Sequence, residues 1–250
     1  MSFSIRFGNL SLDGCVDFAI ASNSRVSDLR FPRRPGSIAP QVPAADSKRI
    51  SISGETFQDS EALMISYLDS LNAALTDQGR SRLFLRTNDR YVFAVKTGFN
   101  HSFSAQRLPL LRAGFAIEFL ADDPYWYGLT ESSDVQTLVA ANLKTWAVTN
   151  NGGTRTPPVI EISRTSAAND QANVKITQST TGQYMQWTGS LASGTKLLFD
   201  CVNSRCSVAG GNGLNAFSGS FFNLESGLNN LRYDGPGNVT ITTNWRERWS

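Results

Sequence analysis

The stretch from residue 113 to 128, AGFAIEFLADDPYWYG, ends at the point where the amino-acid composition of the chain changes. Its first half alternates apolar and small residues as far as Leu120, which predicts a strand. Asp122-Asp123-Pro124 then predicts a turn, because aspartate side chains accept hydrogen bonds from nearby backbone donors and proline fixes its own φ. The aromatic run Tyr125-Trp126-Tyr127 follows directly. We therefore expect a domain boundary just after this segment.

Upstream, over residues 1–129, the sequence predicts strands around one helix. Alternating apolar residues predict short strands within 1–26 and another at 49–54. Asp59 or Ser60 offers an N-cap and Gly79 a C-terminal stop. Between them one apolar stripe recurs at spacings of three and four: Leu63, Met64, Tyr67, Leu68, Leu71, Ala74 and Leu75. Residues 82–86 and 90–95 then predict a β-hairpin, so this part is an α+β domain.

Downstream, over residues 130–250, Ser, Thr, Asn and Gly dominate and short apolar runs alternate with turn residues. Many short strands with such punctuation predict a β-sandwich. The last strand, at 238–249, is expected to place Val239, Ile241, Thr243, Trp245 and Trp249 on one face. The fold class is therefore mainly β with one main helix.

A proline-rich segment interrupts the first domain. Residues 27–48 contain Pro32, Pro35, Pro40 and Pro43. Each proline removes a backbone donor and biases its predecessor toward extended geometry. We expect an extended arm or loop with little internal pairing, centred on residues 31–44.

The overall charge argues against nucleic acid as a partner. The 250 residues carry a net charge of +2, whereas duplex-binding domains concentrate basic charge to neutralise phosphates. The basic residues that cluster lie around the proline-rich segment: Arg30, Arg33, Arg34, Lys48 and Arg49. We also expect no secretory signal and no membrane insertion, because no basic n-region with an apolar core and no long apolar run occurs. We therefore expect the protein to be synthesised in a cytoplasm.

The cysteines and the histidine limit disulfide and metal chemistry. An odd count, Cys15, Cys201 and Cys206, argues against a disulfide framework. Cys201 and Cys206 flank a turn and are placed to face each other across a hairpin; free thiols are the favoured state in a reducing compartment, and a disulfide is the alternative. Because His101 is the single histidine, a structural zinc lacks ligands.

No motif for catalysis appears. The sequence contains neither G-x-S-x-G nor a P-loop. Asp122 and Asp123 are adjacent, so they point to opposite sides of an extended chain and do not flank one glycosidic bond. Tyr125, Trp126 and Tyr127 suit either a sugar or base platform or, more commonly at a junction, packing of one domain on the next. We predict a non-enzyme with no catalytic, cofactor-binding or metal-binding residue.

The order of these parts resembles the siphophage distal tail protein (Dit) family. The N-terminal parts that match are the strand 50–54, the helix 60–75, the hairpin 83–95 and the signature from Phe119 to Gly128. The C-terminal parts are the strand ending Leu198-Phe199-Asp200, the run Phe222-x-Leu224-x-x-Gly227-x-Asn229 and the closing Trp245-Arg246-Glu247-Arg248-Trp249. Segment 31–44 departs from this pattern.

This resemblance implies a structural virion protein at the distal end of a long non-contractile tail. A split-barrel-like N-terminal domain, residues 1–129, would form a homohexameric ring. A galectin-like or carbohydrate-module-like sandwich, residues 130–250, would radiate outward. The implied partners are the tail tube protein, the tail-associated hub protein, and further the tape measure and receptor-binding proteins. The protein would be assembled in the bacterial host cytoplasm and reside at the virion tail tip.

Two rival readings remain. One is a carbohydrate-binding module or lectin, based on the sandwich and on the tryptophans Trp126, Trp146, Trp187, Trp245 and Trp249. The other is a baseplate hub component of a contractile tail-like particle. A lectin needs no α+β domain of this size and binds glycan as a monomer or dimer, which separates it from a ring protein.

Overall fold

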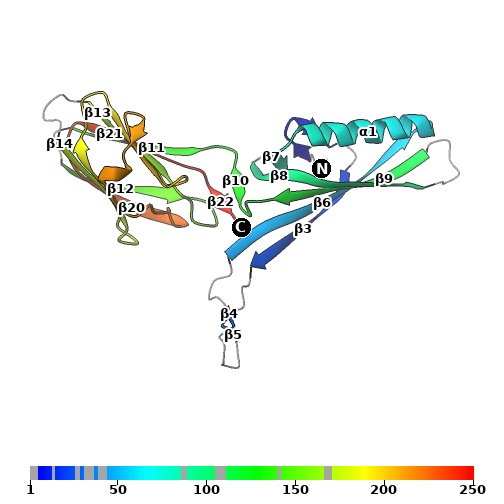
Figure 1. Ribbon diagram of the computed structural model, residues 1–250, viewed down its shortest axis with the longest axis horizontal. Coiled ribbons are helices and arrows are strands. Elements are labelled where there is room, and N and C mark those ends of the chain that lie inside the picture. Colours follow the sequence, from blue (N-terminus) through cyan, green and yellow to red (C-terminus); the bar gives the residue numbers. More distant parts are fainter. Residues whose placement is uncertain are drawn as a thin grey trace. The chain divides into compact units, whose positions relative to one another are not determined.

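The computed structural model describes residues 5–12, 15–25, 29–30, 37–38, 44–85, 89–104, 111–139, 142–165 and 171–250. The chain divides into two compact units, Met1–Leu129 and Thr130–Ser250 (Figure 1). Strands predominate in both units, and none of the helices in the described ranges is long and apolar enough to cross a membrane.

The N-terminal unit is an antiparallel sheet with the strand order β2-β1-β7-β8-β9-β6-β3. The short strand β10 pairs with β8, and β4 and β5 form a separate two-stranded ladder. The strands are β1 Arg6–Phe7, β2 Leu10–Ser11, β3 Cys15–Arg25, β4 Leu29–Arg30, β5 Ser37–Ile38, β6 Ala44–Gln58, β7 Ser81–Phe84, β8 Arg90–Ser104, β9 Leu111–Ala121 and β10 Trp126–Gly128. The pairing of β7 with β8 confirms the hairpin predicted at 82–95.

Helix α1, Glu61–Asp77, lies along one face of this sheet (Figure 1). The Ser60 hydroxyl accepts a hydrogen bond from the Leu63 backbone N–H at 3.3 Å, and Gly79 follows the helix with φ of +57°. These caps and the burial of Met64, Leu68 and Leu75 confirm the helix prediction. Leu63 is the exception, because it is 54% exposed. It precedes Met64 by one residue, about 100° of helix rotation, which turns it off the buried face.

The sheet curls around its own core. Rings of Phe7 on β1 and Phe119 on β9 pack with centroids 4.8 Å apart, although β7 and β8 separate these strands in the sheet order. Strand β8 makes the bend: it pairs with β7 as far as Ala94 and with β9 from Val95, with a register shift between Lys96 and Gly98. The core between the curled sheet and α1 includes Ile5, Ile50, Ile52, Leu83, Val92, Phe115 and Ile117.

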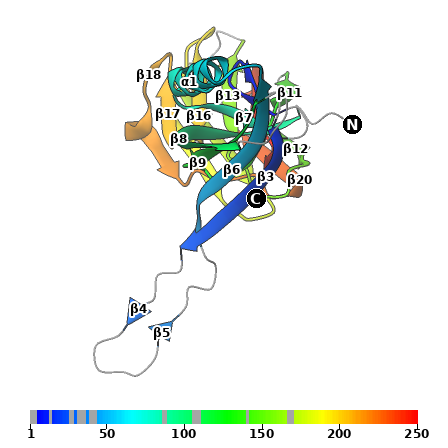
Figure 2. The same cartoon turned by 90° about the vertical axis from the view of Figure 1, so that its right-hand side faces the viewer.

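Strands β3 and β6 form a hairpin along the free edge of the sheet, and they run side by side in both Figure 1 and Figure 2. The ladder of β4 and β5 belongs to the connection between them, pairing Leu29 with Ile38 and Arg30 with Ser37. These two paired positions agree with the expectation of an arm or loop with little internal pairing. Most of the proline-rich segment, residues 31–36 and 39–43, lies outside the described residues.

The C-terminal unit consists of two antiparallel sheets, of orders β11-β21-β13-β16-β17-β18 and β12-β20-β14-β15-β19. The elements are β11 Ser132–Leu138, β12 Leu143–Asn150, β13 Val159–Arg164, β14 Gln171–Gln178, β15 Tyr184–Ser190, β16 Lys196–Asp200, β17 Arg205–Val208, β18 Gly211–Asn212, the 3-10 turn η1 Leu214–Ala216, β19 Phe217–Gly219, β20 Gly227–Asp234, β21 Val239–Trp245 and β22 Arg248–Trp249. One apolar core joins residues of both sheets, as in a β-sandwich.

Three tryptophans form part of this core. Trp146, Trp187 and Trp245 are 7%, 5% and 7% exposed, so they are packing residues and not the open platforms that the lectin reading needs. Val239, Ile241, Thr243 and Trp245 share the buried face of β21, as predicted. The expected single strand over 238–249 is wrong, however. After Trp245 the chain turns to residues 154–156: the Thr156 hydroxyl donates to the Arg246 carbonyl at 2.6 Å, and Thr154 bridges Arg248.

Candidate functional site

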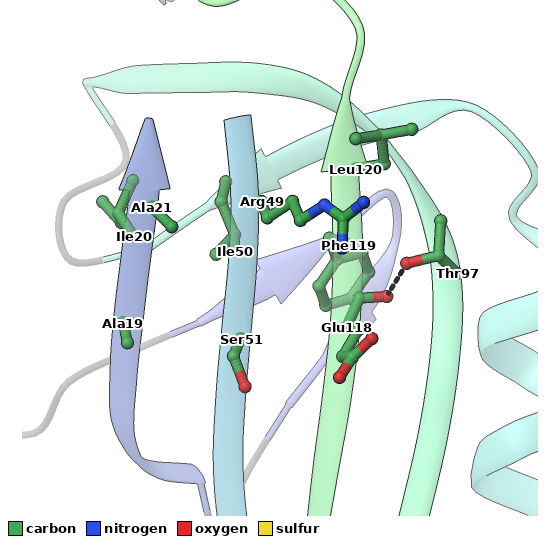
Figure 3. Close-up of a pocket in the computed structure, with 10 residues that line it drawn as sticks. All are labelled: Ala19, Ile20, Ala21, Arg49, Ile50, Ser51, Thr97, Glu118, Phe119 and Leu120. Carbon is green, nitrogen blue, oxygen red and sulfur yellow. Dashed lines mark hydrogen bonds between the residues drawn. The ribbon is translucent and has the colours of Figure 1, made fainter. Parts of the chain in front are cut away.

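The sheet face of the N-terminal unit that points away from α1 carries a shallow cavity of about 350 Å³. Register places Ala19 and Ala21 of β3 opposite Ser51 and Arg49 of β6, so small side chains form its floor. Glu118 of β9 and Thr97 of β8 complete the polar part of the lining. Figure 3 shows the Arg49 side chain extending from β6 across to β9. The cavity is therefore a concave, open surface with one cation and one anion.

This open face is suited to contact with another protein. Val95 on β8, which pairs with Leu120, is 40% exposed on this face. Ile20 on β3 is 42% exposed, but it pairs with the buried Ile50 and so points to the opposite face of the sheet. The Thr97 hydroxyl donates to the Glu118 carbonyl at 3.2 Å, which ties β8 to β9 beneath the cavity (Figure 3). No second element among the described residues of this unit covers the face. A single exposed apolar side chain is ordinary on a protein surface, so it is the uncovered sheet face that leaves room for contact with another protein.

The outer edge of β3 is a second feature of the same surface. Strand β3 ends the sheet order and pairs with β6 alone among the described strands. An edge strand of eleven residues presents unpaired backbone donors and acceptors, which favour pairing with another chain. The open face and this edge together form what we call the assembly surface, defined by Ala19, Ile20, Ala21, Arg49 and Ser51.

The charge cluster predicted around the proline-rich segment is divided by the sheet. Lys48 and Arg49 are neighbours in β6 and so point to opposite faces. Lys48 is 6% exposed and lies 5.6 Å from the ring centroid of Trp126, whereas Arg49 is exposed on the assembly surface. Burial lowers the pKa of Lys48, and the Asp123 carboxylate opposes this shift. Arg33 and Arg34 lie outside the described residues.

The Asp-Asp-Pro-aromatic signature is a packed turn. Asp122 accepts from the Asp123 backbone N–H at 3.1 Å, and Asp123 accepts from the Tyr125 N–H at 3.2 Å and from the Tyr127 hydroxyl. This confirms that the carboxylates cap backbone donors. Tyr127 stacks on Tyr91 at 5.9 Å, and Trp126 packs against the core of the N-terminal unit. These aromatic residues are therefore held within the unit and do not form a free sugar platform.

Residues considered for catalysis or metal binding do not converge. His101 lies exposed on β8 between the rings of Phe99 and Phe103, at 6.2 and 5.3 Å. Asp122 is engaged by Arg80, which lowers the pKa of its carboxyl. Within the described ranges, no three His, Cys, Asp or Glu side chains are grouped so as to hold a metal ion.

Cys201 and Cys206 are buried free thiols. The expectation that they face each other across the hairpin is wrong, because Arg205 already pairs with Asp200 and Cys206 therefore pairs with Phe199. The Cys201 sulfur instead lies 3.6 Å from the Met185 sulfur. Burial raises the pKa of Cys201 to about 12 and that of Cys206 to about 11. Cys15 is a strand residue at the start of β3.

From the burial of Cys201 and Cys206 we predict that both thiols are alkylated slowly and that the folded protein loses stability at high pH. Because folding raises their pKa above 9.0, the folded state holds the protons more tightly, and its stabilisation is complete below pH 9. It is lost as pH rises toward 11 to 12, where the buried Tyr233, whose pKa is also raised by burial, adds to the effect. We expect three thiols to react in denaturant without reductant, and Cys201 and Cys206 to react slowly in the native protein at pH 8. One reactive thiol in denaturant would reveal a disulfide.

The run Phe222-x-Leu224-x-x-Gly227-x-Asn229 owes its pattern to packing and hydrogen bonding. Phe222 and Leu224 are buried in the sandwich core, and Gly227 has φ of +90°, a conformation that favours glycine. Asn229 is fully buried. Its Oδ1 accepts from the Glu225 N–H at 2.8 Å, and its Nδ2 donates to the Glu225 and Gly227 carbonyls at 2.8 and 2.9 Å. The asparagine thus closes the loop that enters β20.

Comparison with known protein families gives a match to the C-terminal part of the chain. Residues 151–249, which contain the run just described, match the family described as siphovirus-type tail component, C-terminal domain. The matched residues lie within the C-terminal unit, which we call the tail component domain after this match. A comparison with curated protein sequences gives no match.

The fold of the whole chain is similar to that of a solved phage protein. The crystal structure of SPP1 Dit (gp 19.1), titled a paradigm of the hub adsorption apparatus in phages infecting Gram-positive bacteria, matches with a TM-score of 0.71 at 13% identity. The match covers 100% of both chains. The phage P2 baseplate in its activated conformation with Ca matches at 9% identity and a TM-score of 0.43, over 96% of this chain and 90% of that one.

Sequence reasoning missed the polar network that holds the tail component domain together. Asn150, at the end of β12, is 1% exposed. Its Nδ2 donates to the Thr154 carbonyl at 2.9 Å, and its Oδ1 accepts from the Gly152 N–H at 3.0 Å. Gln178, fully buried at the end of β14, donates to Asn229 at 2.9 Å. The turn signal Asn150-Asn151-Gly152-Gly153 was visible, but it gave no indication that Asn150 is buried.

Proposed function

We propose that this protein is a distal tail protein that forms a homohexameric ring at the tip of a long non-contractile phage tail. The observation that carries the proposal is the agreement in fold with SPP1 Dit over the full length of both chains, combined with the tail component domain at residues 151–249. The name of that relative refers to a hub adsorption apparatus, and we extend this role to the present chain.

In the proposed ring, the N-terminal unit forms the wall and its assembly surface contacts the next subunit. The edge of β3 supports this arrangement, because a closed ring removes an exposed strand edge by pairing it. The sandwich, galectin-like in this proposal, radiates outward. The ring joins the tail tube protein to the tail-associated hub protein, with the tape measure and receptor-binding proteins as further partners. It acts as a structural virion protein and not as an enzyme, and it is assembled in the host cytoplasm.

The mass of the assembled protein tests this proposal directly. The purified full chain at high concentration is expected to have a light-scattering mass about six times its 27.3 kDa chain mass. Negative-stain images should show six-fold rings with an open centre. Closure rests on apolar burial and backbone pairing, so the mass should persist in moderate salt. A monomer under all these conditions, including in the presence of tail tubes, would contradict the ring.

We further propose that residues 1–129 and 130–250 are independently folding domains. Each has its own apolar core. Limited proteolysis is expected to cut near 127–132 or within 31–46. A fragment of residues 131–250 should retain β-type circular dichroism and cooperative unfolding. An unfolded fragment beside a folded full chain would show that the sandwich needs the first domain.

The lectin reading is the second candidate, and the contractile-tail hub is the third. Burial of Trp146, Trp187 and Trp245 removes most of the sequence basis for the lectin. One-site glycan binding by a protein that stays monomeric at high concentration would nevertheless favour it. Six-fold rings that bind a sheathed tail tube would favour the contractile-tail hub.

A further inference from the structure

Strands β1, β7 and β8 present a row of arginines and aromatic rings on the sheet face that points away from the core. Register places Arg6 opposite Phe84 and Arg82 opposite Phe93. Their neighbours Phe7, Leu83 and Val92 are fully buried in the core on the other face. Strand alternation therefore fixes which residues emerge on the outer face.

Each arginine of this row lies on an aromatic ring. The guanidinium carbon of Arg6 is 4.4 Å from the centroid of Phe84, that of Arg80 is 4.6 Å from Phe93, and that of Arg82 is 4.6 Å from Tyr91. Stacking engages the flat face of a guanidinium and leaves its N–H groups directed outward along the edge. The rings thus hold three long side chains in place, which lowers the entropy lost on binding an anion.

The three arginines line one cavity of about 440 Å³, called here the arginine pocket. Its other polar lining residues are Asn9, Gln78 and Ser81, and none of its lining residues is acidic. Arg80 is paired with Asp122 at 3.1 Å. Arg6 and Arg82 have no carboxylate partner among the described residues, and the Arg6 Nε is buried without a hydrogen-bond acceptor. The pocket therefore carries an uncompensated positive charge.

We propose that the arginine pocket binds carboxylate side chains of an acidic segment of a partner protein. Planar guanidinium groups bind carboxylates through paired, charge-assisted hydrogen bonds, and Asn9 and Ser81 offer further polar contacts. A pocket of this volume accommodates a few side chains. The site lies within the N-terminal unit and its binding does not require ring formation. The proposal for this pocket and the proposal of a hexamer can therefore be tested separately.

A protein carboxylate fits the pocket better than a nucleic acid does. Phosphate backbones are bound along extended basic surfaces, whereas this basic charge is confined to one pocket of a chain with a net charge of +2. Single-stranded nucleic acids also need aromatic faces for base stacking. Here guanidinium groups already cover the rings of Phe84, Tyr91 and Phe93.

The test measures binding of a fluorescent peptide, acetylated Glu-Gly-Glu-Gly-Glu, to the full chain by anisotropy at low salt. We expect saturable binding that Arg6→Gln/Arg82→Gln weakens at least tenfold. The matched control Arg205→Gln removes an exposed arginine from the C-terminal unit and should change affinity less than twofold. The Gln-Gly-Gln-Gly-Gln peptide should not bind. Absence of saturable binding, or equal binding by the double variant, would overturn the proposal.

A second measurement uses the wild-type chain, so it decides the question even where the double variant fails to fold. Phenylglyoxal modifies accessible arginines, and mass spectrometry locates them. The acidic peptide is expected to protect Arg82 at least fivefold and to leave Arg205 unprotected. Equal protection of both residues would contradict the site. Stronger protection of Arg82 by a single-stranded oligonucleotide than by the peptide would assign the pocket to nucleic acid and overturn the proposal.

Discussion

The double variant Ala19→Glu/Ala21→Glu is expected to remain folded but to lose the ring. Both alanines are exposed on β3, so the isolated subunit tolerates longer side chains there. In the proposed ring these positions lie at the subunit interface, where two carboxylates would be buried. The one at position 21 would face Arg49 across the strands, but the one at position 19 would face Ser51 and have no cation opposite it. Such burial costs about 3 kcal/mol or more, which weakens association at least about a hundredfold. Light scattering should then give a monomer at concentrations at which the wild type is hexameric.

The control for this variant is Ala147→Glu in the C-terminal unit. Ala147 is also exposed on a strand, β12, and the same substitution there should leave the hexamer intact, since the sandwich is proposed to be dispensable for closure. Circular dichroism of all variants establishes that the subunits are folded. Rings formed by the double variant with unchanged stability would show that the assembly surface lies elsewhere in the molecule.

Asn229→Leu is expected to destabilise the tail component domain by about 3 to 4 kcal/mol. The substitution removes the amide that bonds Glu225, Gly227 and Gln178, and it leaves a buried N–H and buried carbonyls without partners. Leucine has the same number and branching of side-chain heavy atoms as asparagine, so no cavity is left and lost hydrogen bonding accounts for the effect. Urea unfolding followed by tryptophan fluorescence should report it, because Trp146, Trp187 and Trp245 lie in this core.

The neighbouring residue provides the matched comparison. Asn230 is exposed, and the bond that it accepts from the Ser179 N–H uses its backbone carbonyl, so Asn230→Leu should change the free energy of unfolding by less than about 0.5 kcal/mol. Equal destabilisation by both substitutions would show that the strand position matters and that the Asn229 network does not.

Local patterns predicted much of the fold. The helix at Glu61–Asp77 follows from its 3.6-residue repeat and from the caps Ser60 and Gly79. The hairpin of β7 and β8 and the capped turn at Asp122-Asp123 follow from strand alternation and turn chemistry. The short, turn-separated strands after residue 130 indicated the sandwich. Each of these features depends on neighbours within a few residues, and such neighbours are visible in a sequence.

By itself, then, the sequence determined the mainly β fold, its one main helix and the resemblance to distal tail proteins. Only the tertiary structure decided which polar and aromatic side chains meet. Gln178 and Asn229 are 51 residues apart, and Asn150 reaches the Leu224 carbonyl across 74 residues. Arg6 meets Phe84, and Cys206 meets Phe199 and not Cys201, because strand register sets these contacts. A shift of one residue in register turns every side chain to the other face, and no local pattern specifies a register between strands so distant in the chain.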